Sequence, residues 1–311
     1  MEISSFIKLN QRISSYLPLW TQGAGSNLSL KLDENKMLIK ASGFRLDQVD
    51  AGQGLVTIDF HKLKKQLQEI SNQAPELQES LYSQAIKQSQ IDVSNVNQDP
   101  SMSSVTQLRP SMEAGFHALS KFPLVLHFHS LAAILMGFYY EKKNSQFFAW
   151  AAKEKIHFIP LVKPGWEISK FFLENDFEIN ILMNHGLILQ ASEESVLSRW
   201  EQKESDFLKT FGFEHLLKLK TWSEEGLNQG PLKIYFPDMA IYLERLRPYL
   251  MKVSGSTYFA LKTEAPKDLK EIWWATQILF QSQPDLQELS EKLVEEITQL
   301  PTEKLRQWYM K

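Results

Sequence analysis

The sequence of 311 residues contains no cysteine. This absence excludes disulfide bonds, thiolate zinc sites and cysteine nucleophiles. Any metal ion must therefore be held by histidine, carboxylate or backbone oxygen, so the seven histidines are the first residues to account for.

The chain also has little excess of one charge and no long apolar run. Its formal net charge is −3, and no cluster of lysine and arginine is interleaved with aromatic residues, so nucleic acid is not an expected partner. No stretch approaches the roughly 20 apolar residues that a membrane-spanning helix needs. Residues 1–20 place charged residues among apolar ones, which predicts an amphipathic helix and not a signal peptide. We therefore expect a cytoplasmic protein without a membrane partner.

The first half of the chain alternates between strand-like and helix-like patterns, and with 43% hydrophobic residues it reads as globular. Residues 27–41 predict a β-hairpin, 54–60 a strand, 61–90 one or two surface helices, and 89–110 a polar loop. Residues 110–122 predict a helix with Ser111 as N-cap, and they lead directly into a strand, "LVLHFHS", at residues 124–130.

The second half continues the mixed pattern up to a polar, glycine-containing break. Residues 131–143 predict a helix, 156–162 an extended segment, 164–175 a turn and a helix, 178–190 two strands joined at residues 184–186, and 193–220 one helix. The break at residues 223–231 is the best domain boundary. We therefore predict an α/β domain over residues 1–222 and a smaller, mostly helical region over residues 223–311.

Two histidines stand one residue apart at the end of the strand at residues 124–130. Alternate side chains of a strand point to the same face, so His127 and His129 would project together while Phe128 faces the other way. Two imidazoles aimed at one point are half of a metal site, although two ordinary histidines at a strand end would give the same spacing.

Two further residues have both a structural and a functional interpretation. His185 lies in an Asn-His-Gly turn, which taken alone is more typical of a polar hairpin turn than of a ligand. Glu113 falls near the start of a predicted helix, where the helix dipole favours negative charge, and it is also a candidate acid or base. The remaining histidines are isolated, and each is expected to be a surface or hydrogen-bonded core residue: His61, His117, His157 and His215.

The segments "GAGSN" and "KASG" flank the predicted hairpin. Glycine and small hydroxyl residues are common in turns, but such turns also present backbone N–H groups and a hydroxyl to a phosphate. Neither segment is a Walker loop or a dinucleotide-binding fingerprint, because the required lysine or glycine pattern is absent.

The order of these short motifs resembles the class II aldolase/adducin family along roughly residues 5–215. The motifs that carry the resemblance are, in order, "GAGSNLSLKL", "MLIKASG", "RPSME", "HFHS", "KPGWEISKF" and "NHGLIL". The resemblance implies a three-layer α/β/α domain around a mainly antiparallel central sheet. It also implies a homo-oligomer, usually a tetramer, with active sites at subunit interfaces.

By motif match, the resemblance assigns His127, His129 and His185 as metal ligands. Zinc is the usual metal of the family, with other divalent ions possible. Glu113 matches the family's acid/base glutamate. In the family mechanism, the metal stabilises the enediolate that forms when a C–C bond of a sugar phosphate breaks. The positions that match the phosphate-binding residues are Asn27, Ser42, Gly43 and Ser111.

The resemblance therefore implies a metal-dependent aldolase, a lyase acting on a sugar or sugar phosphate. The same residues would also serve an epimerase, a dehydratase or a decarboxylase, and a non-catalytic, adducin-like binding role is the alternative from another class.

Three positions depart from the family pattern. Met112 replaces a serine of the usual "PSSE" motif and removes one potential phosphate ligand. Ser26 stands where many relatives have glycine. Met239, in "YFPDMAIYL", stands where longer relatives have the histidine of a "PDH" segment, so a site histidine of some relatives is missing.

Overall fold

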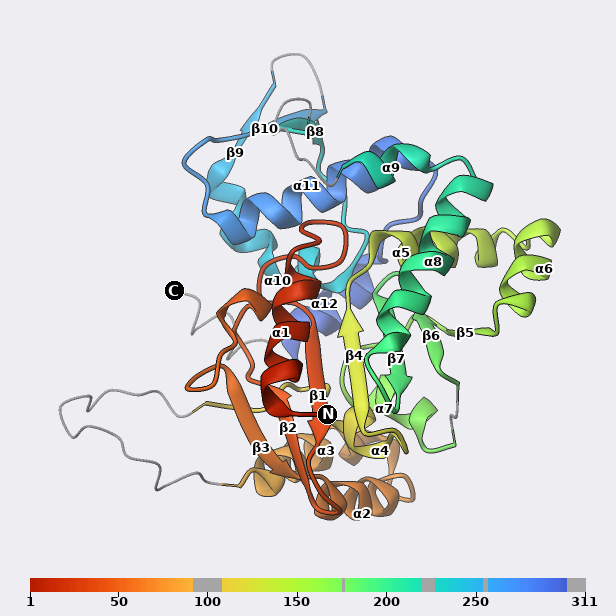
Figure 1. Ribbon diagram of the computed structural model, residues 1–311. Helices are drawn as coiled ribbons and strands as arrows, with labels where there is room; N and C mark the ends of the chain where they lie inside the picture. Colours follow the sequence, from red (N-terminus) through yellow and green to blue (C-terminus); the bar gives the residue numbers. More distant parts are fainter. Residues whose placement is uncertain (92–107, 175–176, 220–226, 254–256, 301–311) are drawn as a thin grey trace.

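A seven-stranded sheet lies at the centre of the computed structural model (Figure 1), which describes residues 1–91, 108–174, 177–219, 227–253 and 257–300. The strand order is β3-β2-β1-β4-β7-β6-β5, and each neighbouring pair is antiparallel except β5 and β6, which are parallel. The strands are β1 (Asn27–Lys31), β2 (Lys36–Lys40), β3 (Leu55–Asp59), β4 (Leu124–Phe128), β5 (Ile156–Ile159), β6 (Ile179–Leu182) and β7 (Gly186–Ala191).

Helices cover both faces of this sheet. The residues of one apolar cluster come from α1 (Ile3–Ser14), α5 (Leu131–Glu141), α6 (Ser145–Lys153), α8 (Ser195–Thr210) and α9 (Glu214–Lys218). A second cluster, on the other face, is built from α2 (Phe60–Ile70), α3 (Pro75–Ser89), α4 (Ala114–Leu119) and α7 (Trp166–Ser169). Short 3-10 helices lie at η1 (Leu46–Gln48), η2 (Lys170–Phe172) and η3 (Arg247–Tyr249). This three-layer arrangement confirms the predicted fold class.

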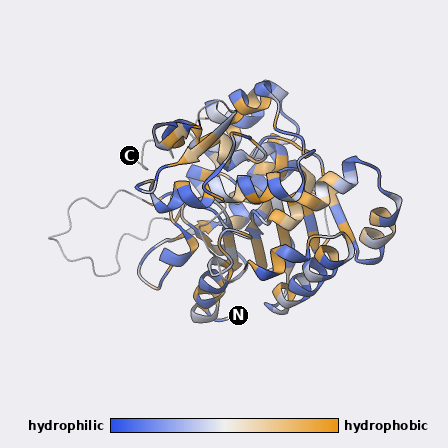
Figure 2. Ribbon diagram, turned by 90° about the horizontal axis from the view of Figure 1, so that it is seen from above, coloured by the Kyte–Doolittle hydropathy of each residue, from blue (hydrophilic) through white to orange (hydrophobic). Residues whose placement is uncertain are grey.

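The central strand β4 shows how the sheet separates the two clusters. Leu124, Leu126 and Phe128 belong to the first cluster, and Val125 belongs to the second. Because strand side chains alternate, His127 points to the same side as Val125. Figure 2 shows the result, with hydrophobic residues gathered on the strands and on the inner faces of the helices.

The C-terminal region packs on the same core. It contains α10 (Pro237–Leu246), α11 (Lys267–Ser282), α12 (Glu291–Gln299) and a small antiparallel sheet of β8 (Gln229–Pro231), β10 (Tyr258–Leu261) and β9 (Leu250–Lys252). Its helices confirm the mostly helical character that we predicted, whereas the small sheet was not anticipated. Trp273 of α11 and Leu135 of α5 lie in one apolar cluster, so residues from both sides of the predicted boundary share a core.

Two predicted helices differ from the structure. The helix expected at residues 110–122 is only α4, and Glu113 precedes it as the N-cap residue. The single helix expected at residues 193–220 is divided into α8 and α9. Gly212 has a φ of +85°, and the Phe213 N–H donates to the Leu208 carbonyl at 2.7 Å, a Schellman-type helix end that turns the buried Phe213 ring into the core. Helix α6 was not predicted.

Two expectations fall on residues outside the described ranges. The polar loop predicted at residues 89–110 lies largely there, and so does the boundary at residues 222–223. The division into residues 1–222 and 223–311 therefore remains a proposal.

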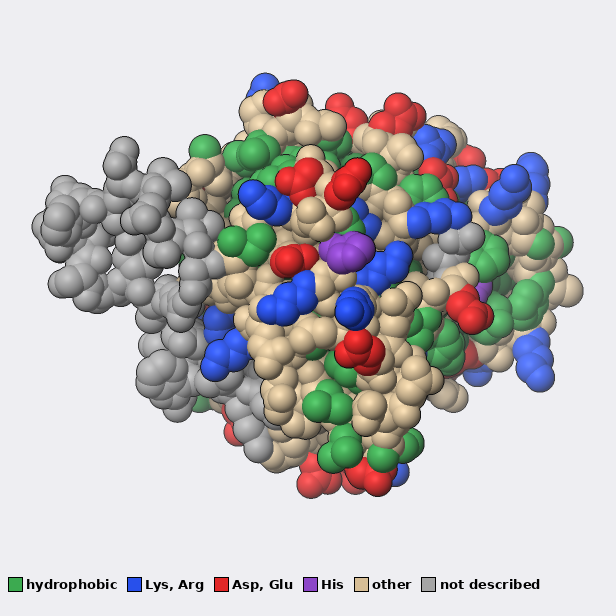
Figure 3. All heavy atoms as spheres, turned by 90° about the horizontal axis from the view of Figure 1, so that it is seen from below, with side chains coloured by type: hydrophobic (Ala, Val, Ile, Leu, Met, Phe, Trp, Pro, Cys, Tyr) green, Lys and Arg blue, Asp and Glu red, His purple; other side chains and the backbone are tan. Residues whose placement is uncertain are grey.

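The face in Figure 3 has no charge patch of a single sign, and the described part of the chain has no membrane-spanning helix. Positive and negative side chains are interspersed on that face. None of the helices within the described ranges combines the length and apolar character that crossing a bilayer requires.

Candidate metal and acid/base site

Three buried histidines meet at one end of the central sheet. His127 lies in β4, His129 follows directly after it, and His185 lies in the turn between β6 and β7. Their ring centroids are 5.0–5.1 Å apart, and one nitrogen of each ring lies within 4.8 Å of the others. Strand alternation thus brings His127 and His129 together as predicted, and the pairing of β4 with β7 adds His185.

The backbone of the β6–β7 turn explains why glycine follows His185. Asn184 adopts a left-handed conformation with φ 53°, and Gly186 has φ 151°. A Cβ atom on Gly186 would lie 2.5 Å from the Phe128 carbonyl oxygen and 2.8 Å from the His129 Cα. Only glycine therefore allows the turn to approach the end of β4 closely enough to place His185 in the cluster.

His127 is oriented and kept neutral by its surroundings. Its Nδ1 lies 2.9 Å from the Leu187 carbonyl oxygen, so Nδ1 carries the proton and donates it to that oxygen. The other ring nitrogen, Nε2, then faces the cluster with its lone pair. Burial lowers the pKa of His127, while the charge of Glu113 acts in the opposite direction. A neutral imidazole with a free lone pair is the form that binds a metal ion.

Glu113 closes the cluster on one side. Its Oε2 lies 3.5 Å from His127 Nε2, and its Oε1 lies 3.6 Å from His185 Nε2. The Glu113 side chain does not cap α4. Instead, its Oε2 accepts a hydrogen bond of 2.7 Å from Asn27 Nδ2. The carboxylate is therefore directed to the histidines and not to the helix end, which disfavours a purely dipolar role.

A chain of hydrogen bonds behind Glu113 includes His117, one of the histidines that we expected to be surface or hydrogen-bonded core residues. His117 is fully buried, its Nε2 contacts Asn27 Oδ1, and its Nδ1 lies 2.7 Å from Ser29 Oγ. Since the amide oxygen only accepts, Nε2 of His117 donates and Nδ1 accepts from the hydroxyl. Burial lowers the pKa of His117 well below its ordinary value, in agreement with a neutral ring. His117 thus fixes the amide of Asn27 so that its N–H group faces Glu113.

The predicted phosphate-binding residues lie together beside this cluster. Asn27, Ser42, Gly43 and Ser111 line one cleft with Glu113, His129 and His185. The end of β2 brings Ser42 close to Ser111, because the Ser42 N–H donates to the Arg109 carbonyl at 2.8 Å and Ala41 pairs with Pro110.

The departures from the family pattern also have a structural setting. Met112 lines the cleft in place of a hydroxyl. Ser26 has a φ of 71°, a conformation that glycine adopts most easily. Met239 is fully buried in the larger apolar cluster, so this position supplies no imidazole to the cleft.

Two charged residues of the cleft were not predicted from the sequence. Lys40 is 2% exposed, and its ammonium group donates to the carbonyl oxygens of Ala24, Ala41 and Phe44 at 2.6–3.3 Å. Asp238, from the first turn of α10, is 1% exposed, and its Oδ2 lies 2.6 Å from His129 Nδ1. The lysine before "ASG" and the aspartate of "PDM" were visible signals, but nothing local places them in the site.

The donor set fits a divalent metal ion. Three buried atoms of the cluster have no hydrogen-bond partner within the described part of the chain: His127 Nε2, His129 Nε2 and Glu113 Oε1. Buried polar atoms without partners are costly, and a bound ion among the three rings would engage them. Three imidazoles leave a coordination position open, as in catalytic zinc sites.

The remaining histidines lie elsewhere, as expected. His157 stacks on Phe177 with ring centroids 4.4 Å apart, and His215 is exposed with its Nε2 3.0 Å from Ser282 Oγ. His61 is exposed on α2.

Comparison with known proteins points to one family. Residues 13–193 match the sequence profile described as "Class II Aldolase and Adducin N-terminal domain". No curated protein sequence matches the chain.

Several solved structures resemble this chain. The N-terminal class II aldolase domain of a conserved protein from Thermoplasma acidophilum is 18% identical with a TM-score of 0.51, over 68% of this chain and 93% of that chain. A sugar-phosphate aldolase from Thermotoga maritima is 14% identical with a TM-score of 0.43, over 70% of this chain and 95% of that chain. The L-fuculose-1-phosphate aldolase from Thermus thermophilus is 10% identical with a TM-score of 0.40, over 71% of this chain and 97% of that chain. At these identities the likeness concerns the fold alone.

Proposed function

The chain belongs to the class II aldolase and adducin family, and from its site geometry we propose that it is a metal-dependent aldolase. Its substrate would be a sugar or sugar phosphate in which a C–C bond is cleaved or formed. The observation that carries this proposal is the buried group of His127, His129 and His185 with Glu113 held 3.5–3.6 Å from two of the rings. A binding scaffold has no need for such a costly buried set.

The three histidines would hold the ion, which we propose to be zinc or another divalent metal. When bound, such an ion supplies Lewis acidity that stabilises negative charge developing on substrate oxygens. Glu113 would hold and deliver the proton, because its carboxylate is buried in the cleft and fixed by Asn27. This arrangement favours chemistry in which a carbanion next to a carbonyl group is formed and protonated.

The other end of the cleft would hold an anionic group of the substrate. Ser42, Gly43 and Ser111 offer hydroxyl and backbone donors there, and Lys40 adds a buried positive charge. Because Met112 offers no hydroxyl, the phosphate would rely on the remaining donors. We further propose a cytoplasmic homo-oligomer, with a tetramer favoured by the family; light scattering tests the oligomeric state.

The first experiment is elemental analysis of the tag-free protein after divalent ions have been added and the excess removed. We expect about one zinc or similar ion per chain, as one three-histidine site allows. His127→Ala should lose this metal, whereas His215→Ala, which removes an exposed histidine outside the cleft, should retain it. Absence of metal from the wild-type protein would refute the catalytic proposal.

The second experiment tests the reaction. Ketoses and ketose 1-phosphates are incubated with the metal-loaded protein, and the products are identified by mass spectrometry and NMR. Aldehyde products support an aldolase, whereas an epimerised, dehydrated or decarboxylated product would assign another reaction to the same site. Glu113→Gln should keep the metal and lose about 10²–10⁴ in rate, the usual contribution of proton transfer. Full activity of this variant would disprove the role of Glu113.

A further inference from the structure

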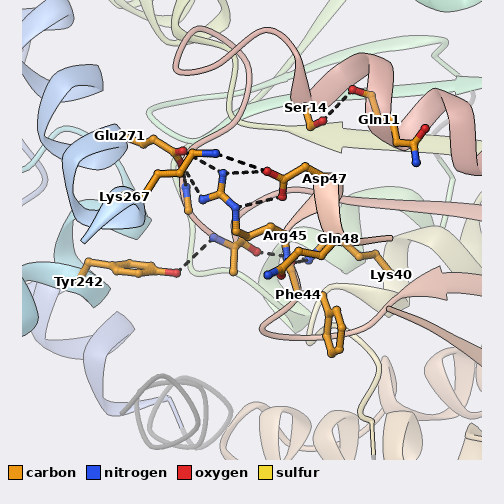
Figure 4. Close-up of polar contacts among 12 residues, drawn as sticks. Gln11, Ser14, Lys40, Phe44, Arg45, Asp47, Gln48, Tyr242, Lys267 and Glu271 are labelled. Carbon is orange, nitrogen blue, oxygen red and sulfur yellow. Dashed lines mark hydrogen bonds and ion pairs between the residues drawn. The ribbon is translucent and has the colours of Figure 1, made fainter. Parts of the chain in front are cut away.

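The C-terminal region holds two loops of the candidate site. The Gly23 N–H donates to Glu271 Oε2 at 2.9 Å, and the Ala24 N–H donates to the Tyr242 hydroxyl at 3.3 Å. Arg45 ties η1 to Glu271 through two hydrogen bonds of 2.8 Å (Figure 4). The contacts of Gly23 and Ala24 fix the loop that leads from α1 to β1, and those of Arg45 hold the segment between β2 and β3 against α11.

The second loop is the β6–β7 turn. Asn184 Nδ2 donates to the carbonyl oxygens of Tyr235 and Gln287 at 3.3 and 3.1 Å. The turn that presents His185 is thus attached to the C-terminal region through the preceding residue. The C-terminal region therefore forms a wall of the site, and the first turn of α10 faces the histidine cluster.

One side chain of this wall makes close contact with a proposed metal ligand. Asp238 Oδ2 lies 2.6 Å from His129 Nδ1, and both side chains are at most 4% exposed. At this separation one of the two atoms must carry a proton, because two facing lone pairs would repel each other, and with the aspartate ionised the proton is on the nitrogen. The contact is short, but it does not have the geometry of a hydrogen bond. If Nδ1 is protonated, the lone pair of His129 is on Nε2.

The neighbouring backbone leaves room for this contact. A Cβ atom on Gly25 would lie 2.3 Å from Asp238 Oδ2 and 2.9 Å from His129 Nδ1. The loop therefore accommodates the carboxylate and the imidazole only because residue 25 has no side chain.

A position in the first turn of a helix already favours an aspartate, since the helix dipole stabilises negative charge. That effect does not require burial, and exposed first-turn acids have it as well. Asp238 is instead buried against an imidazole, and burying a carboxylate is costly unless a partner compensates. The contact with His129 supplies that compensation.

We propose that Asp238 is a positioning residue that fixes the ring orientation and the tautomer of His129, so that the C-terminal region completes the metal centre. This inference depends on the metal centre of the proposed function. A carboxylate behind a metal-binding histidine orients the ring and increases its donor strength, and loss of such a partner typically weakens metal binding about 10–100-fold.

The test compares Asp238→Asn with Asp268→Asn. Asp268 is also a first-turn acid, on α11, but it is partly exposed and pairs with Arg245 Nη1 at 2.8 Å. Affinity for Co²⁺ is measured by competition with a chromophoric chelator on full-length metal-free protein. We expect Asp238→Asn to bind about 10–100-fold more weakly than the wild type, and Asp268→Asn to remain within about twofold. Equal affinity of Asp238→Asn and the wild type would overturn the inference and leave the proposed function standing. Absence of Co²⁺ binding by the wild type would overturn both.

A spectroscopic measurement on the wild type reports the tautomer of His129 directly. In metal-free protein with ¹⁵N-labelled histidine, His129, assigned by comparison with His129→Gln, should show a protonated Nδ1 and an unprotonated Nε2. The opposite tautomer would refute the proposed role of Asp238. In folded Asp238→Asn, this preference should be lost, whereas a purely structural role would leave it unchanged.

Discussion

Replacement of His117 by phenylalanine should destabilise the protein by an amount that its hydrogen bonds determine. The aromatic ring fills the space of the imidazole, so the main loss is polar. Asn27 Oδ1 and Ser29 Oγ would remain buried without the partner that they now share. A buried polar atom left without a partner costs about 1–3 kcal/mol, so His117→Phe should lower the free energy of unfolding by about 2–6 kcal/mol at pH 7.5.

The same variant should alter the pH dependence of stability. Burial lowers the pKa of His117 well below the ordinary value of 6.5, so the folded protein keeps this ring neutral while the unfolded chain takes up a proton. The wild type therefore loses stability as the pH falls below 6.5, and at pH 5 this group accounts for up to about 2 kcal/mol. His117→Phe should lack that contribution, so its stability deficit should be smaller at pH 5 than at pH 7.5.

Urea unfolding of chelator-treated protein, followed by circular dichroism, measures both effects without a contribution from bound metal. The control is Ser29→Ala, alone and combined with His117→Phe. Ser29→Ala alone strands His117 Nδ1, whereas the double variant removes both partners, so its cost should be smaller than the sum of the single variants. A deficit below about 0.5 kcal/mol, or strictly additive costs, would refute this account of the buried chain.

Three further predictions concern other parts of the cleft and its surroundings. Burial raises the pKa of Glu79 from 4.5 to about 7, so the wild type loses stability as the pH rises through this interval. Glu79→Gln should therefore be more stable than the wild type by at most about 3 kcal/mol at pH 8 and equal to it near pH 4, as measured by urea unfolding at both pH values. Gly25→Ala should weaken Co²⁺ binding because its methyl group displaces the groups beside it, whereas Gly52→Ala, where the nearest atom is 3.6 Å away, should bind normally; equal affinities in a chelator competition would contradict the geometry. Lys40→Met should weaken binding of inorganic phosphate at least tenfold in calorimetry, because a buried positive charge is lost, and Lys65→Met, at an exposed position, should not. Undiminished binding by Lys40→Met would exclude a contribution of this charge to phosphate binding.

Local sequence patterns predicted most elements of the fold because their causes are local. The hairpin at β1 and β2 follows from alternation around a polar turn, and β4 follows from a continuous apolar run. The helix ends were less accurate, since the division between α8 and α9 depends on where the Phe213 ring packs. Resemblance to a family supplied the three-layer arrangement, which periodicity alone does not determine.

The sequence by itself determined that any metal must be bound without thiolates, that His127 and His129 share one side of a strand, and that His185 lies in a glycine-containing turn. These conclusions require only residue chemistry and the period of a strand. The tertiary structure alone decided that His117 supports Asn27 and that Asp238 lies against His129. Residues far apart in the chain meet only through sheet pairing and the packing of the C-terminal helices, and no local pattern encodes which buried polar groups will face one another.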